Sequence, residues 1–222
     1  MKYCVFLNGE YPEFNDYHFK LIKDRIIYCA DGGANFAYKQ GIVPHVIVGD
    51  LDSVDLEVLD YYKSKNVKIY DYSSDKDYTD FSIALIHICS IENVCMNSRF
   101  EKDEIDFYQN KDVLVFGATG GRIDMSIANA KLLANNKNMK YVTHNNELIY
   151  YVDKEEKILG KVNKKFSLIP LSDIKGLTLE GFVYNLENKD VSRNMSLVSN
   201  IIKEDIASIS AEKGDMLIVV EI

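Results

Sequence analysis

Three short acidic segments hold the residues of this sequence that are best suited to chemistry. They are Ala30–Asn35, with the sequence Ala-Asp-Gly-Gly-Ala-Asn, Gly49–Ser53, with Gly-Asp-Leu-Asp-Ser, and Asp75–Asp80, with Asp-Lys-Asp-Tyr-Thr-Asp. Each lies at the end of an apolar run or at the start of a predicted helix, where an α/β fold forms its ligand crevice. Carboxylates that converge there commonly hold Mg²⁺, which bridges to a phosphorylated substrate. The aspartates concerned are Asp31, Asp50, Asp52, Asp77 and Asp80.

The pair Asp50 and Asp52 is the first candidate for metal binding. The two residues stand directly after the apolar run Val46–Val48, and an extended backbone would point both side chains to one side. Two carboxylates so placed repel each other unless a cation lies between them. The alternative is that Asp52 or Ser53 only caps the helix predicted over 56–64. Because acids recur at equivalent positions elsewhere in the chain, we favour metal binding.

The segment that ends at Asp80 opens a second predicted helix, over 80–91. Asp77 and Asp80 are three residues apart and share one side of its first turn. Acids and Thr79 at a helix start are also ordinary capping residues, so one of the two aspartates is expected only to cap. Asp80, which lies deeper in the turn, is the better candidate for a metal ligand.

Two glycine-rich turns could bind an anion. The segment Phe116–Arg122, with Phe-Gly-Ala-Thr-Gly-Gly-Arg, lies between a predicted strand and a predicted helix, where backbone N–H groups and the Arg122 guanidinium can face a phosphate. Asp31, Gly32 and Gly33 form a second such turn. Neither turn matches the dinucleotide-binding or P-loop pattern, and a tight turn without a ligand is the open alternative. The scattered histidines disfavour acyl transfer, whereas the acids and glycine loops fit phosphoryl-type transfer.

The elements that must position these residues alternate between strand and helix through about residue 143. Alternation of this kind implies a mostly parallel sheet flanked by helices, which is an α/β fold. The polar stretch 93–111 is expected to be a surface excursion. Strands are predicted at 3–7, 25–29, 46–48, 67–70, 113–116 and 139–143, and helices at 36–40, 56–64, 80–91 and 123–135.

After His144 the pattern changes to short β-type runs separated by Asn, Asp, Gly and Lys. This pattern is typical of a small antiparallel sandwich. We therefore expect an α/β domain over 1–144 and an all-β sandwich domain over 145–222. The β-type runs lie at 147–152, 157–159, 165–170, 176–180, 181–184, 206–210 and 216–221.

Charge and composition exclude several classes of protein. The net charge of −8 argues against nucleic acid as a partner, because binding to phosphate backbones needs clustered Lys and Arg. The four cysteines form no Cys-x-x-Cys pair and the four histidines are isolated, so we expect a reduced, cytoplasmic protein without a zinc site. No stretch approaches the ~20 apolar residues of a membrane span, and the chain leads straight into a predicted strand, so neither a membrane anchor nor a leader is expected.

In order and wording, these motifs resemble those of the thiamine pyrophosphokinase family. The acidic segments are followed by Gly120–Asp124, with Gly-Gly-Arg-Ile-Asp, and late in the chain by Gly181–Leu186 and the pair Ser199–Asn200. The resemblance spans nearly the whole chain, and four ordered N-terminal motifs are far more specific than any one of them. The plan of that family, an α/β domain followed by a β-sandwich, matches the division drawn from the pattern.

The resemblance implies an Mg²⁺-dependent transfer of a pyrophosphoryl group from ATP to the hydroxyl of thiamine, which gives thiamine diphosphate and AMP. It also implies a homodimer, with thiamine between the first domain of one subunit and the sandwich of the other. By matching position, the metal ligands would be Asp50, Asp52 and Asp80. The residues expected around the nucleotide and its phosphates are Asp31, Gly32, Gly33, Asp77, Thr79 and Arg122, and those expected around thiamine are Asp124, Tyr184, Ser199 and Asn200.

Three positions depart from the family pattern, and two other functions stay open. Met125 stands where the family often has His or Gln, Tyr184 where some relatives have a stacking Trp, and 192–195 lacks a glycine often found there.

The first alternative function is a related pyrophosphokinase that acts on a hydroxymethylpterin, and Tyr184 with Ser199–Asn200 favours thiamine over it. The second is a catalytically silent nucleotide- or metal-binding module, against which the retained acids argue.

Overall fold

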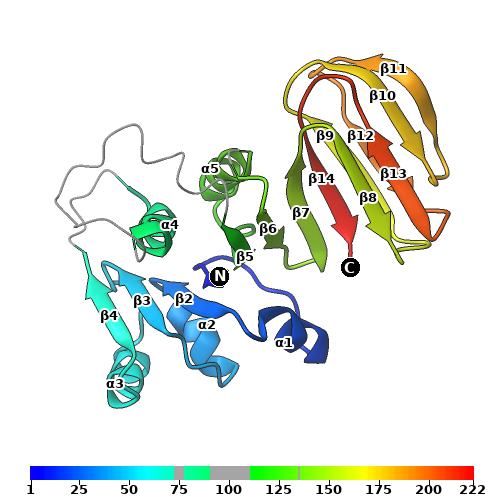
Figure 1. Cartoon of the computed structure of the whole chain (residues 1–222). Coiled ribbons are helices and arrows are strands. Elements are labelled where there is room, and N and C mark those ends of the chain that lie inside the picture. The colour runs from blue at the N-terminus through cyan, green and yellow to red at the C-terminus, as the bar shows by residue number, and fades with distance from the viewer. Residues whose placement is uncertain (73–77, 91–110, 135) are drawn as a thin grey trace.

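A parallel sheet covered by helices forms the first half of the chain in the computed structural model, which describes residues 1–72, 78–90, 111–134 and 136–222 (Figure 1). Its six strands pair in parallel in the order β6-β5-β1-β2-β3-β4. The strands are β1 (Lys2–Phe6), β2 (Ile26–Ala30), β3 (Val46–Gly49), β4 (Lys68–Asp71), β5 (Asp112–Phe116) and β6 (Met139–Val142). The helices are α1 (Asp16–Ile22), α2 (Gly33–Lys39), α3 (Leu56–Ser64), α4 (Asp80–Ser90) and α5 (Ile123–Leu133).

Both faces of this parallel sheet are buried, which explains its near-continuous apolar strands. Successive side chains of a strand point to opposite faces. Tyr3 and Val5 accordingly join the core formed with α4 and α5, whereas Cys4 and Phe6 join the core formed with α1, α2 and α3. The predicted α/β architecture is confirmed.

The sheet does not end with the first half of the chain. Strands β6 and β7 pair as an antiparallel hairpin, and β14, β9 and β12 follow, so that one ten-stranded sheet runs through the molecule. A second sheet, in the order β11-β10-β13-β8, packs on the added strands across a core that includes Phe166, Leu177 and Ile218. The predicted antiparallel sandwich is confirmed, while the division at 144/145 stays a prediction. These strands are β7 (Glu147–Val152), β8 (Glu155–Leu159), β9 (Lys165–Pro170), β10 (Ile174–Glu180), β11 (Leu186–Val191), β12 (Leu197–Ile201), β13 (Ile206–Ser210) and β14 (Met216–Glu221).

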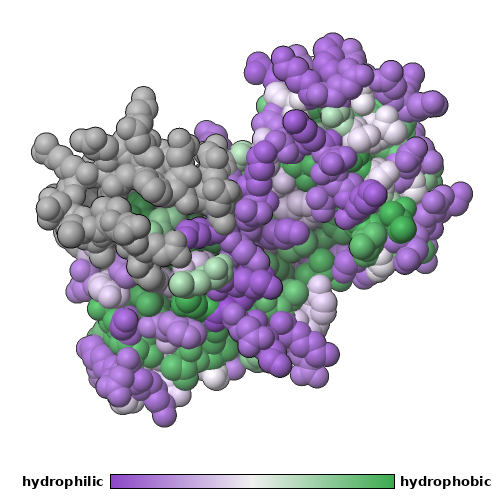
Figure 2. All heavy atoms as spheres, in the orientation of Figure 1, coloured by the Kyte–Doolittle hydropathy of each residue, from purple (hydrophilic) through white to green (hydrophobic). Residues whose placement is uncertain are grey.

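Four elements differ from the sequence-based prediction. Helix α1 and strands β11 and β12 were not predicted, and 181–184, predicted as a strand, forms the turn between β10 and β11. The excursion expected over 93–111 falls almost entirely outside the described residues. Within the described ranges, every helix is too short to cross a membrane. Figure 2 shows that hydrophilic residues dominate the upper end of the sandwich in this view.

Candidate active site

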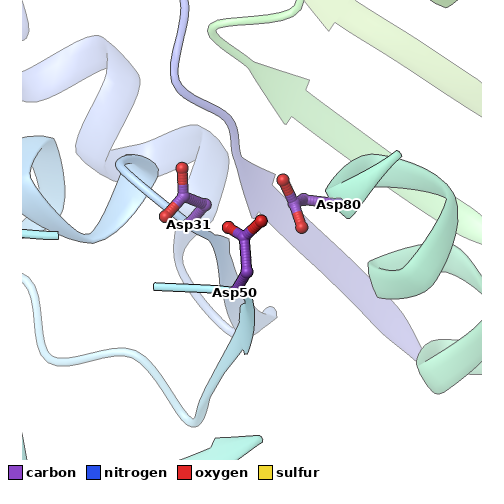
Figure 3. A group of neighbouring side chains, drawn as sticks. All are labelled: Asp31, Asp50 and Asp80. Carbon is purple, nitrogen blue, oxygen red and sulfur yellow. The ribbon is translucent and has the colours of Figure 1, made fainter. Parts of the chain in front are cut away.

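Three carboxylates meet at the ends of neighbouring elements. Asp31 follows β2, Asp50 follows β3, and Asp80 is the first residue of α4. Each offers one carboxylate oxygen, and the three oxygens lie within 4.8 Å of one another; Figure 3 shows the three neighbouring side chains, with those of Asp50 and Asp80 turned toward each other. Asp31 is buried, with 6% of its surface exposed, and the other two are half-buried. We call this cluster, Asp31, Asp50 and Asp80, the acidic group.

Local backbone geometry brings the acidic group together. The Asp31 N–H donates to the carbonyl of Val48 at 2.8 Å, which extends the pairing of β2 with β3 by one residue. The Ser53 N–H donates to Asp31 Oδ1 at 3.2 Å. Gly49 has a φ of +143°. A Cβ atom there would lie 3.1 Å from the Asp31 Cβ and 3.2 Å from Asp80 Oδ1, so a side chain at Gly49 would push the carboxylates apart.

Asp52, expected beside Asp50, is not a member of the acidic group. The expectation assumed an extended backbone, but Leu51 has a φ of +61°, which turns the chain and breaks the alternation of side chains. The Asp52 side chain is exposed, and its Oδ1 accepts a bond from the Ser53 Oγ at 2.9 Å. The structure thus brings Asp31, rather than Asp52, to Asp50 and Asp80, and the role of Asp52 as a ligand stays a prediction.

The remaining residues of the first two motifs take part in local structure. Gly32 and Gly33 are buried at the start of α2, where a Cβ would lie 2.4 Å from the Asn8 side chain and 2.1 Å from the Phe6 carbonyl oxygen, respectively. Thr79 Oγ1 accepts from the Ser82 N–H at 3.2 Å at the start of α4, which is a capping contact. Asp77 lies outside the described residues. Their predicted contacts with the nucleotide stay predictions.

A cavity of about 270 Å³ connects the acidic group with the glycine loop that follows β5. Asp31 and Asp80 line one part of it, and Gly117, Gly120 and Arg122 line another. Gly117, Gly120 and Gly121 have φ values of +72°, +84° and +62°, which residues other than glycine rarely adopt. Among the described residues that line the cavity, Arg122 is the only cationic side chain.

The glycine loop is held by residues that the sequence analysis did not single out. The Glu10 N–H donates to the Thr119 carbonyl at 3.0 Å, and Glu10 Oε1 accepts from the Gly121 N–H at 2.9 Å. The buried Asn129 donates to the Ala118 carbonyl at 2.8 Å. Glu10 belongs to the turn just after β1, at the same edge of the sheet as the acidic group. The position of Glu10 after a predicted strand could have marked it as a candidate site residue. Nothing in the sequence marks Asn129, which is a single Asn inside a predicted helix.

Arg122 and Asp124 form an ion pair at the start of α5. The Arg122 Nη2 and Nε atoms donate to the two carboxylate oxygens of Asp124 at 2.5 and 3.2 Å, and both side chains are largely exposed. The bond from Arg122 lowers the pKa of Asp124 below its ordinary value. Met125, next along the helix, lines the cavity, so the departure from the family pattern at this position falls on its wall.

Three of the four residues predicted around thiamine lie in the sandwich, and the fourth, Asp124, lies at the start of α5. Tyr184 stands in the turn between β10 and β11 and has 71% of its surface exposed. Ser199 and Asn200 belong to β12; Ser199 is exposed, whereas Asn200 is buried and bonded to the backbone of Tyr184. In Figure 1 the turn after β10 lies at the far right, well away from α4 and the ends of β2 and β3. One chain therefore does not bring these three residues to its own acidic group.

Comparisons with known proteins cover both halves of the chain. The family model described as thiamin pyrophosphokinase, catalytic domain, matches residues 19–143, and the model of the vitamin B1 binding domain matches 150–215. Thiamine pyrophosphokinase 1 of Oryza sativa subsp. japonica is 28% identical over 231 residues, which cover 94% of this chain and 83% of the relative. Thiamine pyrophosphokinase of Bacillus subtilis is 28% identical over 196 residues, covering 85% and 84%.

Solved structures share the fold. The thiamin pyrophosphokinase from Candida albicans matches with a TM-score of 0.80 at 24% identity, covering all of this chain and 90% of that one. The Bacillus subtilis structure matches with a TM-score of 0.79 at 22% identity, covering 100% and 99%. At these identities the structures support the architecture, and the family models carry the assignment.

Proposed function

Because this chain belongs to the thiamine pyrophosphokinase family, we propose that it transfers a pyrophosphoryl group from ATP to the hydroxyl of thiamine, with Mg²⁺, and releases AMP. The family itself supports the coarser statement that the chain is an enzyme that makes thiamine diphosphate by pyrophosphoryl transfer. One observation carries the finer proposal. Asp31 and Asp80 of the acidic group line the same cavity as the glycine loop and Arg122, so groups suited to a cation and groups suited to phosphates face one space.

The acidic group fits Mg²⁺ in its chemistry. Its three candidate donors are carboxylate oxygens within 4.8 Å of one another, and Mg²⁺ prefers oxygen ligands and is commonly held by a few carboxylates together with substrate phosphates. Asp31, Asp50 and Asp80 would hold the ion, and Asp52 stays a further candidate on the same loop. A bound Mg²⁺ would neutralise charge on the phosphates during the transfer.

The glycine loop and Arg122 would orient the triphosphate. The backbone N–H groups at the start of α5 and the guanidinium of Arg122 favour negative charge. In the transfer, the thiamine hydroxyl oxygen bonds to the β-phosphorus, and the bond from that phosphorus to the oxygen it shares with the α-phosphate breaks, which releases AMP. The hydroxyl proton needs an acceptor, and we assign this role to Asp124. If Arg122 moves to phosphate, Asp124 loses the partner that lowers its pKa and becomes a stronger base.

The acceptor site is completed by a second copy of the chain in this proposal. Tyr184 is a large exposed aromatic residue that can stack on a flat cationic heterocycle, yet its turn lies far from the acidic group of the same chain (Figure 1). A homodimer would bring the sandwich of one copy to the cavity of the other. Further exposed apolar residues lie close in sequence to Tyr184 and along β12, as expected of a contact surface: Val183, Val198 and Ile201.

The test measures AMP release from ATP and Mg²⁺ with thiamine and, separately, with a hydroxymethylpterin. We expect AMP and thiamine diphosphate with thiamine alone. Formation of ADP and thiamine monophosphate would contradict the pyrophosphoryl step, turnover of the pterin alone would assign the other acceptor, and no turnover of either would indicate a silent module. The free thiols of Cys4, Cys29 and Cys89 support the proposed cytoplasmic location, where thiols stay reduced.

A further inference from the structure

The side chain of Asn200 is occupied by the backbone around Tyr184. Its Nδ2 atom donates to the Tyr184 carbonyl at 2.8 Å, and its Oδ1 accepts from the Tyr184 N–H at 3.1 Å. The same oxygen accepts from the Ile201 N–H at 2.9 Å. Asn200 has 7% of its surface exposed. An amide offers two donors and one carbonyl oxygen with two lone pairs, so these bonds use both acceptor sites and one of the two donors.

The chain around this contact is shaped to bring Asn200 inward. Ser199 has a φ of +62°, and the pairing of β12 with β9 shifts register between Leu197 and Asn200. Such a bulge re-aims side chains along a strand. It places Asn200 against the turn that carries Tyr184, instead of leaving it exposed like the two residues before it.

The turn is anchored by the two residues before Tyr184, while Tyr184 itself stays exposed. Phe182 is buried, its ring lies 4.4 Å from that of Phe166, and its backbone bridges to Ile202. The Val183 N–H donates to the Ile201 carbonyl at 2.9 Å. Asn200 then satisfies both backbone groups of Tyr184, as a paired strand would. A fixed backbone beneath an exposed aromatic ring reduces the freedom that the ring must lose on binding a ligand.

We infer that Asn200 is a positioning residue, which holds Tyr184 ready to stack on the heterocycle of the acceptor instead of contacting that acceptor itself. The inference rests on the proposed function for the identity of the acceptor, but the bonds that carry it do not depend on that identity. It reassigns Asn200 from the direct contact that the sequence analysis expected, because its carbonyl oxygen and one of its two donors are already bonded to the backbone of Tyr184 and Ile201.

A double-mutant cycle separates the two roles. We expect Tyr184→Ala to raise the KM for thiamine roughly 5- to 30-fold through the lost stacking contact, and Asn200→Ala to raise it about 3- to 10-fold with little change in kcat. If Asn200 acts through Tyr184, the double variant has a KM within about twofold of Tyr184→Ala alone. A KM equal to the product of the two separate increases would show an independent contact and overturn the inference.

Asn200→Asp guards against a failure of Asn200→Ala to fold. It keeps an oxygen for the N–H groups of Tyr184 and Ile201, but it replaces the donor to the Tyr184 carbonyl with a second carboxylate oxygen that repels this carbonyl. We therefore expect Asn200→Asp also to raise the KM for thiamine, and a wild-type KM in this variant would overturn the inference. The matched control is Ile209→Val, which removes one methyl group from the core of the same sandwich. It should lower the melting temperature without raising the KM for thiamine; if it raised the KM as Asn200→Ala does, loss of stability alone would explain both variants.

A second measurement needs no turnover. The chain contains no tryptophan, so Tyr184→Trp introduces a single indole at the turn. We expect its fluorescence anisotropy, without ligand, to fall when Asn200→Ala is added and to stay unchanged when Ile209→Val is added. Unchanged anisotropy in the Asn200→Ala background would overturn the positioning role. Absence of thiamine turnover in the wild type would instead refute the proposed function and leave this measurement as the test of Asn200.

Discussion

Removing one charge from the acidic group should have opposite effects on stability with and without Mg²⁺. Asp50→Asn keeps the shape of the side chain and abolishes its repulsion with two neighbours that lie within 4.8 Å. At that distance two unit charges repel by about 0.9 kcal/mol in the dielectric of water and by about 3.5 kcal/mol at an effective dielectric constant of 20. Because Asp50 is half-buried and salt screens the pair, we take the lower value for each of the two pairs.

The expected gain in the free energy of unfolding is therefore about 1–2 kcal/mol for Asp50→Asn in EDTA. For a chain of this size, 1 kcal/mol corresponds to about 2–4 °C in melting temperature, so the variant should melt about 2–8 °C above the wild type. Mg²⁺ at ten times its Kd should stabilise the wild type by about 1.4 kcal/mol. The variant, with one ligand lost, should respond much less, so the difference between the two proteins shrinks or reverses.

The assay is thermal unfolding at low ionic strength, in EDTA and across a Mg²⁺ titration. Asp205→Asn, at an exposed position, is the control that also removes one charge. Its melting temperature should stay close to that of the wild type both in EDTA and in Mg²⁺. Asp52→Asn in the same titration tests that residue: a weakened response to Mg²⁺ would support it as a ligand, and a wild-type response would leave Asp31 in its place. If Asp50→Asn melted below the wild type in EDTA and still responded fully to Mg²⁺, the acidic group would not be a cation site.

Three further predictions follow from contacts outside the acidic group. Glu10→Ala removes the acceptor of the Gly121 N–H and should raise the KM for ATP about fivefold, equal to about 1 kcal/mol. Glu10→Gln keeps an acceptor oxygen, so its KM for ATP should stay near that of the wild type; equal effects of the two variants would argue against the hydrogen bond. Tyr62→Phe leaves the buried carbonyl of Ile42 without its 2.8 Å bond and should cost about 1–3 kcal/mol in urea unfolding; no loss would mean that water replaces the hydroxyl. Burial lowers the pKa of His87, so the unfolded chain takes up the proton first, and the free energy of unfolding should fall as the pH drops through about 6.5. His87→Leu should flatten the dependence of the free energy of unfolding on pH between 7.5 and 5.5. An unchanged slope would assign the effect to other groups.

The parallel sheet could be predicted from sequence because its central strands are buried on both faces, so that β1, β2, β3 and β5 are almost continuously apolar. Strands β11 and β12 escaped prediction for the opposite reason. They lie at the outer edges of their sheets, where most of their side chains are exposed, and polar residues there leave no alternation to detect. The turn at 181–184 was predicted as a strand because its apolar residues resemble one. In the structure, Phe182 is buried and anchors the turn, whereas Tyr184 is exposed.

The candidate site that the sequence predicts and the group of carboxylates that the structure brings together share Asp50 and Asp80, while Asp31 takes the place expected for Asp52. The rule that ligands bind at the carboxyl ends of strands agrees with the positions of Asp31 and Asp50, which follow β2 and β3 and lie close to Asp80. It does not reveal the left-handed backbone at Leu51, between Asp50 and Asp52, because leucine gives no signal for that conformation. The role of Asn200 was equally hidden, since it depends on a register shift between two strands that are distant in the sequence.

The hairpin of β6 and β7 joins the two parts that the family models match separately into one continuous sheet. The hairpin contributes the pairs Lys140–Tyr150, Tyr141–Ile149 and Val142–Leu148, and its turn is tied to α1 by a 2.9 Å bond from His18 to Asn146. A cut at residue 144 would leave the backbone groups of β7 unpaired along a long edge that is prone to aggregation. Residues 145–222 produced alone should therefore self-associate, and the intact chain should unfold in a single transition in which the sandwich and the helix-covered sheet melt together.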